Sequence, residues 1–214
     1  MGTRYIYDWL MQVRFMRVAE IVESSRIYGP GSRTVLWLQG CSIQCEGCWN
    51  DELWSFSGGK KMSSEEIIQI LQNNSDLGLT LLGGEPLDQA PAVLKLIENC
   101  HMSGFDVMLY TGYELEELSK VQKQCAERSD IVIHGRYVHE LRSVHLLWRG
   151  STNQKILINN SKFDSIDLTE KRQFEIHINE KGLINVIGYP TSEILASIQS
   201  TNGQLKSHSI VKRT

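Results

Sequence analysis

Three cysteines stand close together at Cys41, Cys45 and Cys48, in a C-x3-C-x2-C spacing. Thiolates this crowded are better suited to binding metal than to forming disulfides with one another. A cubane iron–sulfur cluster has four irons, so three cysteines leave one iron without a protein ligand. Because open coordination sites are where bound metals meet substrates, the spacing predicts a reactive cluster whose function goes beyond storing an electron.

Alternating strands and helices are predicted from about residue 34 onwards. The expected strands and helices, in chain order, are a strand at 34–39, a helix after a capping box at 63–66, a strand at 79–82, a helix at 91–102, a strand at 105–110, a helix at 115–126, and strands at 131–133 and 155–158. This alternation indicates a parallel sheet with covering helices, because parallel neighbours need crossover connections.

Two chemically suggestive segments follow strands directly. The cysteine loop comes after the strand at 34–39, and the run Gly83-Gly84-Glu85-Pro86 comes after the strand at 79–82. In folds of this class, sites form at the carboxyl ends of the strands. Sequence order therefore predicts that both segments lie on the same rim of the sheet.

The end of the chain has a different pattern. Residues 175–178 and 183–187 are apolar runs separated by a short segment that ends in glycine, which predicts a β-hairpin. A short helix is expected over Thr191–Ser200, and the polar residues 201–214 are expected to fray. Residues 1–15 are ambiguous between helix and strand.

Composition indicates a globular protein. The chain has 214 residues, 41% of them hydrophobic and 22% charged, with a net charge of -3. That length suits one domain with a small appendage. No basic block stands out, so we expect no nucleic-acid binding, and the longest apolar runs are too short to span a membrane. Charges within residues 4–18 interrupt any secretory signal, so a cytoplasmic protein with reduced cysteines is expected. Cys100 and Cys125 then serve as small buried hydrophobes.

Two motifs together resemble the radical S-adenosylmethionine (SAM) superfamily: C-x3-C-x2-C after a first strand and Gly83-Gly84-Glu85-Pro86 after a second. Gly29-Pro30-Gly31-Ser32-Arg33, ahead of the cysteine strand, resembles a segment of glycyl-radical-enzyme activases. Cys48-Trp49-Asn50 is similar to their Cys-aromatic-Asn continuation.

Within that group, residues 109–113 and 148–154 are similar to segments of the activating proteins of anaerobic ribonucleoside-triphosphate reductase. Gly47 fits the same narrower group, since many other radical SAM proteins have an aromatic residue there. The resemblance covers about 18–158. His134 departs from it, standing where that family usually shows an acidic residue, and the tail hairpin exceeds a minimal activase.

The resemblance implies an α/β fold, a partial (β/α)6 TIM-like barrel with a parallel sheet and a C-terminal β-hairpin appendage. It divides the chain into an N-terminal extension at 1–17, a radical SAM core at 18–158, and a hairpin and helix appendage with a tail at 159–214. The implied cofactors are a [4Fe-4S] cluster and S-adenosyl-L-methionine, whose amino and carboxylate groups chelate the open iron.

The resemblance also implies an activity. Reductive cleavage of SAM gives methionine and a 5′-deoxyadenosyl radical, which abstracts hydrogen and so generates a glycyl radical on a partner enzyme of the anaerobic ribonucleotide reductase type. The implied partners are that glycyl-radical enzyme, or another protein substrate, and a flavodoxin- or ferredoxin-type electron donor. No catalytic side chain is expected beyond the cluster and SAM.

Site residues follow from the same resemblance. Cys41, Cys45 and Cys48 are the expected metal ligands. Glu85 would accept a hydrogen bond from the ammonium group of SAM, a charge-assisted contact of about 1.5–3 kcal/mol, and the glycines before it would let the backbone approach the methionine. Trp49 offers a wall for the adenine. The full set of residues expected to bind the cofactors is Gly47, Trp49, Gly83, Gly84, Glu85, Thr111, Ser151 and Asn153.

Three other interpretations stay open from the sequence. A radical SAM enzyme could act on a different peptide or small metabolite, with His134 and the tail hairpin in a new substrate site. A non-catalytic iron–sulfur electron carrier would give no reason for Gly83-Gly84-Glu85-Pro86. A zinc site with a histidine as fourth ligand leaves the same run unexplained, and no histidine has a tight spacing to the cysteines.

Overall fold

The computed structural model describes residues 14–169, 174–178, 184–188, 193 and 196–197. Within these residues the main element is a seven-stranded sheet of order β3-β1-β2-β4-β5-β6-β7. Its strands are β1 (Phe15–Ser25), β2 (Arg33–Leu38), β3 (Lys60–Ser63), β4 (Gly78–Gly83), β5 (Asp106–Tyr110), β6 (Ile131–His134) and β7 (Lys155–Ile158).

The sheet is parallel at its centre and antiparallel at both edges. β2, β4, β5 and β6 pair in parallel, which confirms the predicted α/β fold. β7 pairs antiparallel with β6, so extending the parallel pattern to 155–158 was wrong. The connection from 135 to 154 contains no crossover helix, and without one the chain returns in the opposite direction.

Two antiparallel strands, β1 and β3, extend the other edge. Neither was predicted. β1 is buried at Met16 and Val18, but Glu20 takes the next position of this alternation. A strand with this mixed pattern gives little periodicity to detect.

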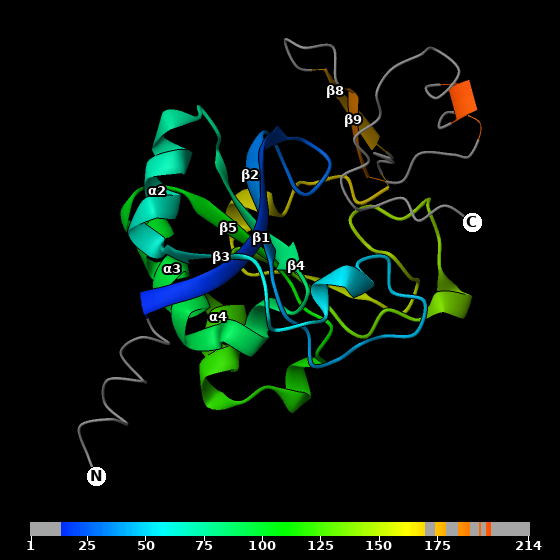
Figure 1. Ribbon diagram of the computed structural model, residues 1–214, viewed down its shortest axis with the longest axis horizontal. Helices are drawn as coiled ribbons and strands as arrows, with labels where there is room; N and C mark the ends of the chain where they lie inside the picture. Colours follow the sequence, from blue (N-terminus) through cyan, green and yellow to red (C-terminus); the bar gives the residue numbers. More distant parts are fainter. Residues whose placement is uncertain (1–13, 170–173, 179–183, 189–192, 194–195, 198–214) are drawn as a thin grey trace.

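Three helices, α2 (Ser64–Asn73), α3 (Ala90–Met102) and α4 (Lys120–Arg128), gather on one side of the sheet (Figure 1). α2 begins with the predicted capping box, in which the Ser63 side chain accepts from the Glu66 backbone N–H and the Glu66 side chain accepts from that of Ser63. Between residues 15 and 169, the remaining helical segments are single 3-10 turns: η1 (Asp51–Leu53), η2 (Pro86–Gln89), η3 (Leu115–Glu117), η4 (His139–Leu141) and η5 (Ser161–Phe163). Residues 193 and 196–197 are also helical.

The single helix predicted at 115–126 is two segments. η3 ends before Leu118, whose ψ of 130° is extended, and α4 starts from a second capping box formed by Ser119 and Gln122. A residue in the N-cap conformation cannot also continue the preceding helix.

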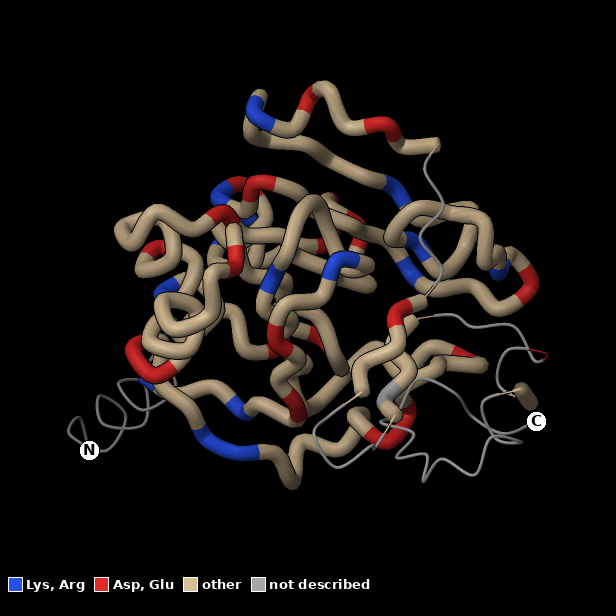
Figure 2. Tube along the Cα trace, turned by 90° about the horizontal axis from the view of Figure 1, so that it is seen from above, with Lys and Arg blue, Asp and Glu red and all other residues tan. Residues whose placement is uncertain are grey.

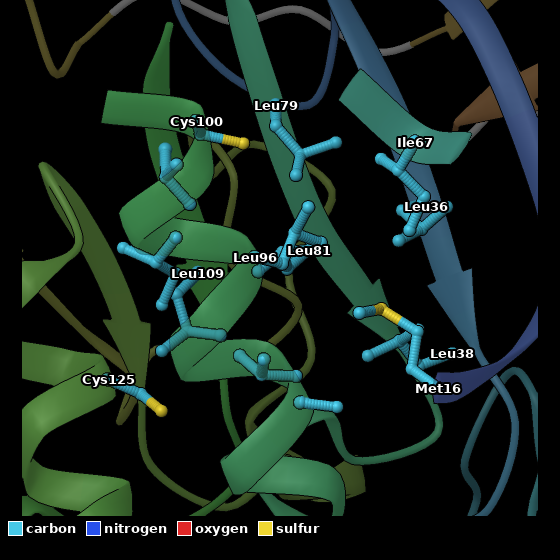
Figure 3. Close-up of a cluster of buried hydrophobic side chains, with 14 of the residues drawn as sticks. Met16, Leu36, Leu38, Ile67, Leu79, Leu81, Leu96, Cys100, Leu109 and Cys125 are labelled. Atoms are coloured by element: carbon cyan, nitrogen blue, oxygen red, sulfur yellow. The ribbon is translucent and has the colours of Figure 1, made fainter. Parts of the chain in front are cut away.

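The core between helices and sheet is built from alternate residues of the parallel strands. Leu36 and Leu38 of β2 and Leu81 of β4 pack with Ile67 of α2 and Leu96 of α3 (Figure 3). Cys100 and Cys125 lie in the same cluster, each fully buried, which confirms the prediction that they act as small hydrophobes.

The opposite face of the sheet carries a second apolar cluster. Val35 and Trp37 of β2 and Leu82 of β4 pack there against Ile27 and Tyr28. A two-stranded ribbon, β8 (Phe174–Ile178) paired antiparallel with β9 (Ile184–Gly188), adds to this side. The connection between the two strands, most of the helix predicted at 191–200, and residues 1–13 and 201–214 lie outside the described residues.

Surface charge is mixed. Lys and Arg are interspersed with Asp and Glu along the chain (Figure 2). In the part of the chain that the structure describes, no helix has the length and apolar character needed to cross a membrane.

Arg33, the arginine of the Gly-Pro-Gly-x-Arg segment, is buried and links three strands through its guanidinium group. It is 1% exposed, and its Nε donates to Thr80 Oγ1 (2.8 Å) while Nη2 donates to the Leu79 carbonyl (2.7 Å). Nη1 pairs with Asp106, which Lys162 Nζ also contacts at 3.1 Å. The structure therefore gives this motif residue a role in joining β2, β4 and β5.

We expect Asp106→Ala to lower the free energy of unfolding by about 3–5 kcal/mol, because it leaves the buried guanidinium without its partner. The measurement is urea denaturation of the reduced apoprotein. Glu98→Ala, which breaks an exposed pair with Arg128, is the matched control and should cost less than about 1 kcal/mol. Equal losses in the two variants would contradict the role given to Arg33.

Candidate functional site

The cysteine loop follows β2 and folds back on itself. The Gly40 N–H donates to the Leu53 carbonyl (2.8 Å), and the Cys41 N–H donates to that of Trp54 (3.1 Å). The Cys48 N–H donates to the Cys45 carbonyl (3.2 Å), which closes a tight turn around the second and third cysteines. These bonds hold the three thiols on one short, backbone-fixed segment.

The run after β4 meets this loop directly. The Gly84 N–H donates to the Leu38 carbonyl and the Glu85 N–H to the Gly40 carbonyl, each at 2.8 Å. The prediction that the two segments share a rim is therefore confirmed.

The two glycines of that run allow the protein's own segments to approach each other. A Cβ on Gly83 would lie 2.3 Å from the Leu38 nitrogen, and one on Gly84 would lie 2.1 Å from the Gly40 carbonyl oxygen. From the sequence, we predicted that these glycines let the backbone approach a bound ligand. In the structure, the missing Cβ atoms make room for the backbone of β2 and of the cysteine loop.

Asp88, in η2, connects the cysteine loop to two other segments, and the sequence analysis did not identify it. Its carboxylate accepts from the Ser42 N–H (2.6 Å), the Ser42 hydroxyl (2.8 Å) and the Tyr113 hydroxyl (3.0 Å). It thereby ties the cysteine loop to the segments after β4 and β5. No local pattern could reveal this contact, because Asp88 and Ser42 are 46 residues apart in the sequence.

Glu85 is a buried carboxylate surrounded by donors. It is 1% exposed, and its oxygens accept from the Leu87 N–H (2.8 Å), the Thr111 hydroxyl (2.9 Å) and the Gly112 N–H (2.8 Å). A carboxylate has about four lone-pair sites, so these three bonds leave one free. Burial raises the pKa of Glu85 to about 7, although the three hydrogen bonds oppose that rise.

This raised pKa predicts a pH-dependent stability of the apoprotein. Glu85 is protonated in the native state up to about pH 7, whereas in the unfolded chain it ionises near 4.5. The unfolded state therefore binds fewer protons across this window, and the free energy of unfolding should fall by about 3 kcal/mol as pH rises from 4.5 to 7. Urea denaturation of wild type and Glu85→Gln across that range measures it. Parallel curves for the two proteins would contradict the assignment.

The segment between β6 and β7 closes over the cysteine loop. Gly47 has φ of +67°, and a Cβ there would lie 2.5 Å from Nδ1 of His139. The Arg142 guanidinium lies 4.2 Å from the ring centroid of Trp49. The glycine at position 47 therefore accommodates a histidine from a distant loop, a contact that no local pattern could reveal.

Ser151 and Asn153 lie in this closing segment. The Ser151 hydroxyl accepts from the Val138 N–H (3.2 Å), and the Asn153 amide donates to the Arg136 carbonyl (2.7 Å). Their observed hydrogen bonds thus hold the segment itself. Neither residue is among those that line the cavity described next.

One cavity brings most of the predicted site residues together. Its lining includes the three cysteines and Trp49 from the cysteine loop, Gly83, Gly84, Glu85 and Pro86 after β4, and Thr111 and Gly112 after β5. The rest of its lining is Ile27, Tyr28, Trp37, Ile43, Asn50, Leu82, Tyr110, Tyr137, Leu146, Trp148, Gly150, Gln154 and Gly188.

The cavity has the donor set of a cluster and cofactor site. Burial raises the pKa of the Cys41 and Cys45 thiols, so each keeps its proton until a metal ion binds the sulfur and displaces that proton. Two lining residues have buried polar atoms without a hydrogen-bond partner, Oδ1 of Asn50 and Nε1 of Trp148. A bound group with donors and acceptors fits such a lining better than an apolar ligand does.

A single-metal site is not found in the part of the chain that the structure describes. Among the described residues, no group of three or more His, Cys, Asp or Glu side chains is arranged to hold one metal ion. A zinc ion needs four ligands around one centre, whereas each thiolate of a cubane cluster takes its own iron. The geometry therefore gives no support to the zinc interpretation.

Comparisons with known proteins agree with this donor set. A family model described as a 4Fe-4S single cluster domain matches residues 27–157. The anaerobic ribonucleoside-triphosphate reductase-activating protein of Salmonella typhimurium (strain LT2) is 32% identical over 150 residues, covering 66% of this chain and 97% of the relative. Proteins of the same name from Escherichia coli (strain K12) and Enterobacteria phage T4 are each 33% identical, covering 61% and 62% of this chain and 90% and 88% of those relatives. Among solved structures, QueE from Escherichia coli has a TM-score of 0.42 at 17% identity, covering 63% of this chain and 75% of that one.

Proposed function

The chain belongs to the 4Fe-4S family of the anaerobic ribonucleoside-triphosphate reductase-activating proteins, and from this membership we propose that it generates a glycyl radical on a reductase of that kind. It is a radical SAM oxidoreductase with a [4Fe-4S] cluster and S-adenosyl-L-methionine as cofactors. The main structural support for the proposal is that the three cysteines and the buried Glu85 line the same cavity.

We propose that Cys41, Cys45 and Cys48 each hold one iron. When bound, the cluster and SAM supply reductive cleavage of the sulfonium and a 5′-deoxyadenosyl radical that takes hydrogen from the partner. Glu85 lines the cavity, and its remaining lone pair is proposed to accept from an N–H of the amino group of SAM. Thr111 orients that carboxylate through its hydroxyl, and Trp49 offers an aromatic wall for the adenine.

Gly47, Ser151 and Asn153 are proposed to act indirectly. Gly47 lets His139 lie against the cysteine loop, and the hydrogen bonds of Ser151 and Asn153 hold the segment between β6 and β7 together. A cavity closed on that side excludes water from a reactive radical, which is the protein's main contribution in cofactor chemistry of this kind.

The finer architecture is part of the proposal. We propose that the sheet curls around the cavity as a partial barrel, with the extension at 1–17, the core at 18–158 and the appendage at 159–214. The strand β1 (Phe15–Ser25) crosses the first of these proposed boundaries. β8 and β9 are proposed to be joined as a hairpin.

The wider setting is likewise proposed. A flavodoxin- or ferredoxin-type protein supplies the electron. All five cysteines are free thiols, which fits a reducing compartment such as the cytoplasm.

The proposal is tested first by SAM cleavage. Anaerobically reconstituted protein, supplied with dithionite and SAM, should release 5′-deoxyadenosine. A full cluster without that product would overturn the enzyme assignment. If 5′-deoxyadenosine forms while a peptide or small metabolite is consumed instead of a reductase being activated, the alternative radical SAM function holds.

A further inference from the structure

The ribbon of β8 and β9 lies beyond the residues that match the family model, yet it takes part in the cavity. Ile187 is 7% exposed and packs in the apolar cluster with Tyr28 and Trp37, both of which line the cavity. Gly188, at the end of β9, is itself a lining residue. The ribbon lies on the side of the sheet away from α2, α3 and α4 (Figure 1).

A polar anchor holds the same ribbon to the core. The Glu175 carboxylate of β8 accepts from the Ser25 hydroxyl at 2.8 Å and from the Arg26 backbone N–H at 2.6 Å. Its side chain is 19% exposed, so these bonds are partly shielded from water. Ile176 and Ile178 of β8 are 44% and 67% exposed. The ribbon is therefore docked through Glu175 on β8 and the end of β9, while its two β8 isoleucines remain largely open.

The cavity is lined by a polar group of residues and by an apolar, aromatic group. The cysteines and Glu85 are polar and face the methionine end of SAM under the proposed function. Ile27, Tyr28, Trp37 and Leu82 supply apolar and aromatic surface, and Trp49 packs against the same cluster. Aromatic and apolar surface suits a flat nucleoside better than a zwitterionic amino acid.

We propose that the β8–β9 ribbon is a wall of the cofactor cavity that retains the adenosyl part of bound SAM. The proposal rests on the SAM site proposed above. Ile187 packs with Tyr28 and Trp37, Gly188 completes the lining, and Glu175 fixes the ribbon in place. Loosening either attachment opens the nucleoside end of the cavity to water, which weakens binding without touching the thiols or Glu85.

The test is calorimetric binding of S-adenosylhomocysteine, which is not cleaved, to full-length, cluster-reconstituted protein. Ile187→Ala should raise the dissociation constant about tenfold, and Glu175→Ala should raise it several-fold. Ile178→Ala is the matched control, since it removes an isoleucine of the same ribbon that is mostly exposed, and should stay within about twofold. Iron content should be equal in all proteins.

A second measurement keeps the proposal testable if Ile187→Ala folds poorly. Hydrogen exchange at the amides of 184–188 in the wild type should slow when S-adenosylhomocysteine binds. Unchanged exchange, or equal affinities in Ile187→Ala and Ile178→Ala, would contradict the role proposed for the ribbon but not the proposed cofactor site. Failure of the wild type to bind S-adenosylhomocysteine would overturn the cofactor site as well, whereas loss of partner activation alone would leave the wall intact.

Discussion

We expect Cys45→Ala to abolish cluster assembly and SAM cleavage, whereas Cys125→Ala should leave both intact. Cys45 opens on the cavity with the other two loop cysteines, so its loss leaves two thiolates for a four-iron cluster. Cys125 is fully buried in the core, where it packs as a small hydrophobe.

The measurement is iron and sulfide content with the visible absorption of the reconstituted protein, followed by 5′-deoxyadenosine release. The Cys45 variant should show less than about one hundredth of wild-type cleavage, a loss equivalent to at least ~3 kcal/mol of transition-state stabilisation. Assembly of a normal cluster in Cys45→Ala, or its loss in Cys125→Ala, would contradict the ligand assignment.

Glu85→Gln should weaken SAM binding about 10- to 100-fold. A charge-assisted hydrogen bond is worth about 1.5–3 kcal/mol, and the substitution removes the charge while nearly preserving shape. Because burial raises the pKa of Glu85 to about 7, an N–H donor that binds the ionised carboxylate should also release a proton below that pH. Affinity in the wild type should therefore rise with pH up to about 7 and then level off.

Calorimetry with S-adenosylhomocysteine between pH 5.5 and 8 measures both effects. Glu98→Gln, an exposed carboxylate on α3 outside the cavity lining, is the control and should retain wild-type affinity and pH dependence. A purely structural role for Glu85 would lower stability while leaving the affinity of the folded protein unchanged, which is the outcome that would count against the proposed contact.

The central strands were predictable because they are buried on both faces. β2, β4 and β6 are continuous runs of buried residues, and such runs between turn signals predict strands without tertiary information. β1 is charged on part of its length and was missed for that reason. The break between η3 and α4 was also missed, although the Ser119–Gln122 capping box was present in the sequence.

Some residues of the candidate site could be predicted from the sequence and others could not. The shared position of the cysteines and Glu85 was predictable, because adjacent residues form their motifs and the order of strands put both motifs on one rim. His139 against Gly47 and Asp88 beneath Ser42 are contacts between segments far apart in the chain. Only the folded structure brings such residues together, so sequence alone could not have found the support that holds the cysteine loop in place.

The measurement that tests the central proposal most directly is electron paramagnetic resonance of the co-encoded reductase after incubation with this protein. With a reduced [4Fe-4S] cluster and SAM, the account predicts a glycyl-radical doublet on the reductase, absent with Cys45→Ala and present with Cys125→Ala. Release of 5′-deoxyadenosine without any radical on that partner would contradict it.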